Sequence, residues 1–138
     1  MPADLPPPFI CIVVKVHDGD TLTCKTGEKV RLAAIDTNEL DGTCHTNCAK
    51  QSAREARNTL AWLIGGKVDE SRSVRRSGQV SREKLVLANA PVVRFAVVGR
   101  SGKRLVGDNM TLRCRMVAAG AAVPLERYRA RYNLRRCR

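Results

Sequence analysis

The chain has 138 residues, a length that suits one domain built around a single hydrophobic core. Lys and Arg together number 25 against 13 Asp and Glu, and the resulting formal net charge of +12 at pH 7 favours a polyanion such as nucleic acid as the partner. No apolar run approaches the roughly 20 residues that span a bilayer, which argues against a membrane protein.

Six cysteines are many for an intracellular domain of this size, and their even number favours disulfides formed in an oxidising compartment. We therefore expect a secreted or periplasmic protein whose signal peptide is absent from this sequence. The pairing stays open, because several connectivities are compatible with Cys11, Cys24, Cys44, Cys48, Cys114 and Cys137. A zinc site at Cys44-His45-Thr46-Asn47-Cys48 is the alternative, since Cys and His are the usual zinc ligands.

The N-terminal half opens with a proline-rich arm, residues 1–9, that we expect to be flexible. β-branched and apolar residues then predict three strands in a meander, over 10–16, 21–25 and 30–35. Apolar residues next recur three and four positions apart. They predict an amphipathic helix through Ala53, Ala56, Leu60 and Leu63 that ends at Gly65-Gly66.

In the C-terminal half, the charged residues 69–84 predict a mobile loop. A strand over 92–98 follows, with a hairpin partner over 99–106 and a short helix over 110–121 capped by Asn109. This order of elements predicts an α+β, mainly β fold. We expect a five-stranded Greek-key OB-fold barrel with two or three helices over residues 10–130, followed by a basic tail over 131–138.

Acidic residues gather at two predicted strand ends. Asp18-Gly19-Asp20-Thr21 joins the first two strands, and the third strand closes with Arg31-Leu32-Ala33-Ala34-Ile35-Asp36-Thr37-Asn38-Glu39. Carboxylates at adjacent strand ends can converge on one hard cation, and oxygen ligands of this kind suit Ca²⁺. His17, beside the first segment, is interpreted as a surface histidine.

These two segments resemble the thermonuclease (staphylococcal nuclease-like) family, especially its small cysteine-containing bacterial members. Gly99-Arg100 and the run from Asn109 to Val123 add to the resemblance, which covers most of residues 10–130 and fades between 69 and 90.

The resemblance implies calcium ligation by the side chains of Asp20 and Asp36 and by the backbone carbonyl of Thr37. It implies that Glu39 is the general base that activates or orients the attacking water. It also implies that Arg31 and Arg100 grip the phosphate oxygens, because a planar guanidinium offers paired donors.

The chain departs from the family pattern around the second arginine. Arg100 is the first choice for that role, with Arg94 and then Arg104 left open. Val98 stands where the family usually has a tyrosine, which weakens the expectation of nucleotide stacking there. Asn38 stands where the family generally has proline, and we expect the loss of that rigid residue to loosen Glu39.

The sequence therefore predicts a monomeric, calcium-dependent endonuclease that hydrolyses DNA and RNA with little base specificity, since the expected contacts are to phosphate and metal. The alternative is a non-catalytic OB-fold module that binds nucleic acid or protein and has a degraded active site. The C-terminal arginines with Tyr128 and Tyr132 fit either a nucleic-acid-binding surface or a merely soluble basic tail.

Overall fold

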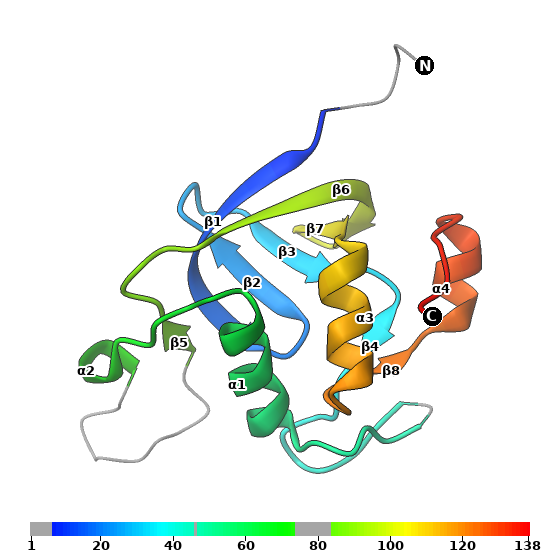
Figure 1. Ribbon diagram of the computed structural model, residues 1–138, viewed down its shortest axis with the longest axis horizontal. Helices are drawn as coiled ribbons and strands as arrows, with labels where there is room; N and C mark the ends of the chain where they lie inside the picture. The colour runs from blue at the N-terminus through cyan, green and yellow to red at the C-terminus, as the bar shows by residue number, and fades with distance from the viewer. Residues whose placement is uncertain (1–6, 46, 74–83) are drawn as a thin grey trace.

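The computed structural model describes residues 7–45, 47–73 and 84–138 (Figure 1). Residues 1–6 of the predicted arm and 74–83 of the predicted mobile loop lie outside the described residues. The elements are, in order, β1 (Phe9–Asp18), β2 (Thr21–Cys24), β3 (Lys29–Leu32), β4 (Ile35–Asp36), α1 (Ala53–Leu63), α2 (Glu70–Ser73), β5 (Leu85–Val86), β6 (Val92–Ser101), β7 (Arg104–Asp108), α3 (Met110–Ala118), β8 (Val123–Pro124) and α4 (Glu126–Arg131).

The predicted α+β, mainly β class is confirmed. Six strands form one mixed sheet in the order β2-β3-β7-β6-β1-β5, and an additional pairing of β2 with β1 closes a hydrogen-bonded ring of five strands. The ring closes because β1 is long: its first half pairs with β6 and its second half with β2. The pairing of β3 with β7 is parallel, while the other pairs of the ring are antiparallel.

The third predicted strand, 30–35, is interrupted. Ala34 has a φ of 60°, in the left-handed region that residues with a side chain rarely adopt. The chain therefore turns after β3, and β4 pairs with β8 in a separate two-stranded sheet. This turn directs the segment after Asp36 away from the six-stranded sheet.

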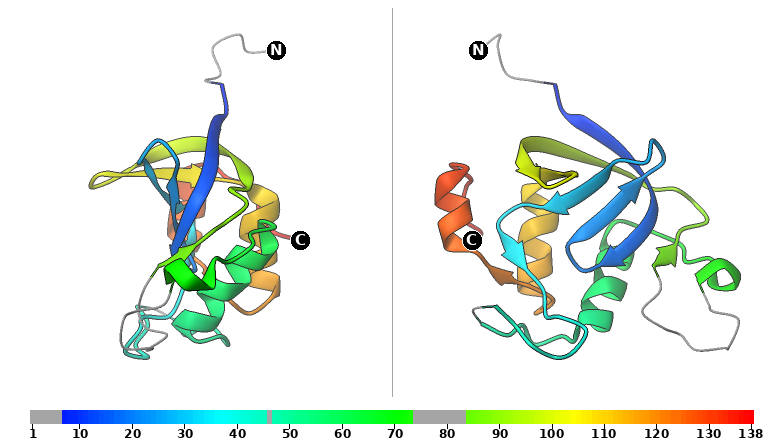
Figure 2. Two further views of the ribbon diagram at one scale, coloured as in Figure 1. Left: turned by 90° about the vertical axis from the view of Figure 1, so that its left-hand side faces the viewer. Right: turned by 180° about the vertical axis from the view of Figure 1, so that it is seen from behind.

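Four helices occur among the described residues, where the sequence predicted two or three. The predicted helices correspond to α1 and α3, whereas α2 and α4 are short segments of 4 and 6 residues. α1 begins at a capping box formed by Ser52 and Glu55. Figure 1 and Figure 2 show α1 and α3 on one side of the sheet, with α4 and α2 at opposite ends of the molecule.

The core inside the ring is aliphatic, in keeping with an aromatic content of only 4%, and Phe95 is the one aromatic residue among its buried, described residues. The buried residues of α1 pack against β1, and α1 also contacts α3. Burial of these apolar side chains is the main stabilising contribution to a domain of this size.

All six cysteines form disulfides: Cys11–Cys24, Cys44–Cys48 and Cys114–Cys137. The zinc reading of Cys44 and Cys48 is therefore wrong, because their sulfurs are bonded to each other. Among the described residues, no helix has the length and apolar character needed to cross a membrane.

Candidate active site

The turn between β1 and β2 places Asp18 and Asp20 at the floor of a cleft. A side chain on Gly19 would stand 2.7 Å from Cγ2 of Thr37 and 2.8 Å from Cβ of Ala56, so only glycine allows the turn to approach this closely. The backbone N–H of Asp20 donates to Oδ1 of Asp18 at 3.0 Å. The two carboxyl groups are thereby held on neighbouring positions of one tight turn.

Arg31 braces the second acidic segment. Its Nη1 donates to the carbonyl of Leu32 at 2.6 Å, and its Nη2 donates to the carbonyl of Ile35 at 2.8 Å, across the left-handed Ala34. These bonds tie the end of β3 to the start of β4. They also fix the direction in which Asp36 emerges.

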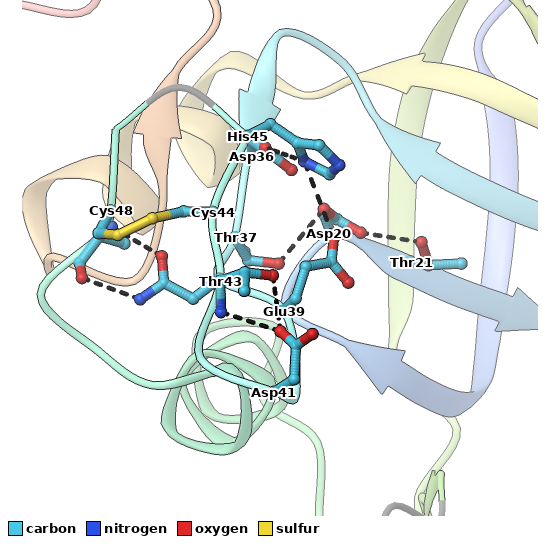
Figure 3. A network of polar contacts seen from close by, with 12 residues as sticks. Asp20, Thr21, Asp36, Thr37, Glu39, Asp41, Thr43, Cys44, His45 and Cys48 are labelled. Carbon is cyan, nitrogen blue, oxygen red and sulfur yellow. Dashed lines mark hydrogen bonds and ion pairs between the residues drawn. A yellow bond between two sulfur atoms is a disulfide. The ribbon is translucent and has the colours of Figure 1, made fainter.

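Asp20 and Asp36 converge on Arg31. Nη2 of Arg31 lies 3.4 Å from Oδ2 of Asp20 and 3.7 Å from Oδ1 of Asp36. The hydroxyl of Thr37 donates to Asp20 at 3.3 Å and that of Thr21 donates at 3.0 Å (Figure 3). Asp20 and Asp36 are only 7% and 9% exposed, so the structure brings two predicted ligands together in a poorly hydrated place.

The pKa values of Asp18 and Asp20 are shifted in opposite directions. Burial acts to raise the pKa of Asp20, but the charge of Arg31 and the hydrogen bonds from its neighbours outweigh it and hold that pKa below its ordinary value. Burial, followed by the charge of Asp20, raises the pKa of Asp18 to about 7. The turn therefore carries one firmly ionised carboxylate and one carboxyl that is partly protonated near neutrality.

This donor set suits a hard dication. Carboxylate and carbonyl oxygens are the ligands that Ca²⁺ prefers, and Ca²⁺ accepts irregular geometry and water as further ligands. Within the described parts of the chain, no three His, Cys, Asp or Glu side chains are already gathered in an arrangement that could hold an ion. Asp20 and Asp36 could supply two side-chain ligands, and the other ligands would have to be backbone carbonyls and water.

Glu39 lies further out, in a tight turn above the buried carboxylates. Its side chain is 52% exposed, and its backbone N–H donates to the carbonyl of Thr43 at 2.9 Å. Asp41 closes the turn by accepting from both the N–H and the hydroxyl of Thr43. The predicted base therefore belongs to a well-bonded turn, with its carboxylate accessible from the cleft.

His45 joins the cluster, which the sequence did not predict. Its Nδ1 lies 3.0 Å from Oδ2 of Asp36 and 3.8 Å from Oε1 of Glu39. The hydrogen bond to Asp36, followed by the charges of Asp36 and Glu39, raises the pKa of His45. The signal in the sequence was a histidine between two cysteines, for which disulfides were expected, with the pairing open, and a zinc site was the alternative.

A cleft of about 830 Å³ covers the cluster. Its walls carry cationic and aromatic side chains, namely His17, Arg54, Arg57, Lys84, Arg104, Tyr128 and Tyr132. The predicted phosphate contact Arg100 is exposed on β6 and is not among the lining residues, and neither is Arg94. Arg104, the third choice from the sequence, does line the cleft.

The remaining wall residues follow from the fold. His17 is half-buried and bonded to the hydroxyl of Thr23, so it is not a simple surface histidine. Tyr128 and Tyr132 stack with their ring centroids 6.2 Å apart, and Arg131 lies over the ring of Tyr128. Aromatic rings beside cations are typical of surfaces that bind single-stranded nucleic acid.

No protein-family model matches the chain, and a search of curated proteins found no match either.

Proposed function

We propose that this chain is a calcium-dependent nuclease of the thermonuclease type, a phosphodiesterase that hydrolyses DNA and RNA with little base specificity. The observation that carries the proposal is the convergence of buried Asp20 and Asp36 beside Arg31, on the floor of a cleft lined by further cations. Two poorly exposed carboxylates side by side suit a metal that binds phosphate, because such a metal needs oxygen ligands of this kind.

Each residue at the site has a separate role in the proposed hydrolysis. Glu39 accepts a proton from the attacking water, for which its exposed carboxylate is available. Arg31 and Arg104 bind the phosphate oxygens and stabilise the charge that grows on them. Arg104 can offer two parallel donors, whereas Arg31 contributes mainly its charge because its Nη atoms also donate to the carbonyls of Leu32 and Ile35. When bound at Asp20, Asp36 and the Thr37 carbonyl, Ca²⁺ would neutralise phosphate charge and help to orient the nucleophile.

Little base specificity is expected, because these contacts are directed at phosphate. Tyr128 and Tyr132 support an unpaired strand as the preferred substrate, since stacking on an aromatic ring accepts any base.

The proposal also includes an OB-fold barrel and export from the cell. The closed ring of five strands supports an OB-fold barrel, a scaffold that commonly binds oligonucleotides. The three disulfides support export, as a secreted or periplasmic monomer, because such bonds persist in oxidising compartments.

A second candidate is a non-catalytic module that binds nucleic acid. One observation favours it: Arg31 and His45 already partner the acidic pair, so the cluster is electrostatically satisfied by the protein itself. A metal has to displace or share these partners before it can act.

The deciding experiment is cleavage of labelled single-stranded DNA by the wild type and by Glu39→Gln, with Ca²⁺ or with a chelator. Calcium-dependent cutting that falls by about 10²-fold or more in the variant is the expected result. Salt-sensitive binding without cutting in either condition would refute the nuclease and support the binding module.

A further inference from the structure

Asn38, directly before Glu39, makes a closed set of hydrogen bonds. Its Nδ2 donates to the carbonyls of Ala49 and Gln51, both at 3.0 Å. Its Oδ1 accepts from the N–H of Ala49 at 2.8 Å. The amide therefore uses donors and acceptor together, which no other side chain of this size can reproduce.

The segment that Asn38 binds is itself anchored to the helices. The N–H of Gln51 donates to the carbonyl of Gly120 at 2.9 Å, and its Nε2 donates to the carbonyl of Ala119 at 3.2 Å. The hydroxyl of Thr59, on α1, donates to Oε1 of Gln51 at 2.7 Å. Asn38 is thus tied to the start of α1 and the end of α3, which are parts of the packed domain.

The turn that carries Glu39 has its own bonds beyond Asn38. Residues 39–43 are closed by backbone bonds between Glu39 and Thr43 and between Gly42 and Glu39. The Cys44–Cys48 disulfide then shortens the path back to Ala49. The described parts of this loop, 38–45 and 47–49, are therefore bonded internally. The Asn38 side chain links their Glu39 end to Ala49 and Gln51, in addition to the contact of His45 with Asp36.

We infer that Asn38 is a positioning residue that holds the carboxylate of Glu39 over the cleft. The absence of a proline ring at position 38 predicts a looser Glu39. The structure supplies a different restraint, in which three side-chain hydrogen bonds fix the loop where proline would fix one dihedral angle. This inference rests on the proposed nuclease function, because positioning matters only if Glu39 acts on a substrate.

Asn38→Asp is the sharpest probe, because it keeps the size and the acceptor but replaces the two-proton donor with a carboxylate oxygen. That oxygen would face the carbonyls of Ala49 and Gln51, and two acceptors repel each other. Asn47→Asp is the matched control, since Asn47 is an exposed asparagine in the same loop and the change of charge is identical.

The experiment compares both variants with the wild type by kcat and KM on labelled single-stranded DNA at saturating Ca²⁺, and by amide hydrogen exchange at Glu39. Asn38→Asp is expected to lower kcat by about 10²-fold with KM within about twofold, since a misplacement of about 1 Å costs that much. Exchange at Glu39 should accelerate, calcium affinity measured by calorimetry should change little, and Asn47→Asp should behave as the wild type.

Equal kcat and equal exchange in the two variants would overturn the inference, as would a kcat loss in Asn38→Asp that follows entirely from weaker calcium binding. If Asn38→Asp does not fold, Asn38→Ser takes its place with the same expectations. If the wild type itself does not cut, the nuclease proposal fails. The exchange comparison then still decides whether Asn38 fixes the loop.

Discussion

Arg104 and Arg100 provide a matched pair for testing which arginine binds the phosphate. They stand four positions apart on one hairpin, where Arg104 opposes Ser101 and Arg100 opposes Leu105. Arg104 lines the cleft and Arg100 is exposed outside its lining. We therefore predict that Arg104→Ala impairs cleavage and that Arg100→Ala does not.

The expected loss follows from the bond that is removed. A hydrogen bond to a charged group contributes about 1.5–3 kcal/mol, which corresponds to a fall of roughly 10- to 150-fold in kcat/KM. Stability should hardly change, within about 0.5 kcal/mol, because Arg104 donates to the hydroxyl of Ser101 at 3.2 Å, a neighbour on the same hairpin. Arg100→Ala should leave kcat/KM within about twofold of wild type, since the side chain is exposed.

The assay is kcat/KM on labelled single-stranded DNA at saturating Ca²⁺, with thermal unfolding as the check on stability. Arg104→Lys separates charge from geometry: it should recover only part of the loss, because an ammonium lacks the planar pair of donors. An equal or larger loss in Arg100→Ala would refute the placement of substrate in this cleft.

Three further predictions concern stability and binding. In chelator, the lowered pKa of His17, from 6.5 to about 4, costs stability as pH falls, while the raised pKa of Asp18, from 3.8 to about 7, costs stability as pH rises. Urea titrations over this range should show that the free energy of unfolding decreases as pH is raised in His17→Asn and increases as pH is raised in Asp18→Asn. The same pH dependence in both variants would contradict these two pKa shifts. Asp108→Ala should cost about 3–5 kcal/mol in urea unfolding, because it strands the buried charge of Arg113 that Asp108 binds at 2.7 Å, and a loss under 1 kcal/mol would show that the pair is hydrated. Tyr128→Ala, in a Glu39→Gln background, should weaken oligonucleotide binding by about 1–3 kcal/mol in fluorescence anisotropy, and unchanged affinity would remove this wall from the substrate path.

The two longer helices could be predicted from the pattern of neighbouring residues. The spacing of Ala53, Ala56 and Leu60 predicted α1, and Asn109 does cap α3 by accepting from the N–H of Leu112. The ring of strands needed more, because β3 and β7 are far apart in the chain and pair in parallel. Their register depends on packing over long distances, which a window of neighbouring residues does not contain.

Some residues of the candidate site could be predicted from the sequence, and others could not. The proximity of Asp20 and Asp36 was predictable because Asp20 lies in the turn between two strands and Asp36 ends another, and such positions can meet in space. The choice between Arg100 and Arg104 was not, because it depends on the hairpin turn: the chain reverses between the two residues, and only one of them faces the cleft. His45 was missed because its position depends on the Cys44–Cys48 disulfide.

The residues that surround the cleft are held by different forces from those that form the core. The ring is stabilised by buried aliphatic side chains, whereas α4 has no buried residue and the turn around Glu39 is mostly exposed. These segments are fixed instead by the disulfides Cys114–Cys137 and Cys44–Cys48 and by polar bonds such as those of Asn38. A small domain with one core has few apolar contacts to spare for its surface loops, so disulfides hold the loops around the cleft. The high cysteine content of the sequence is thereby explained by the cleft as much as by the stability of the ring.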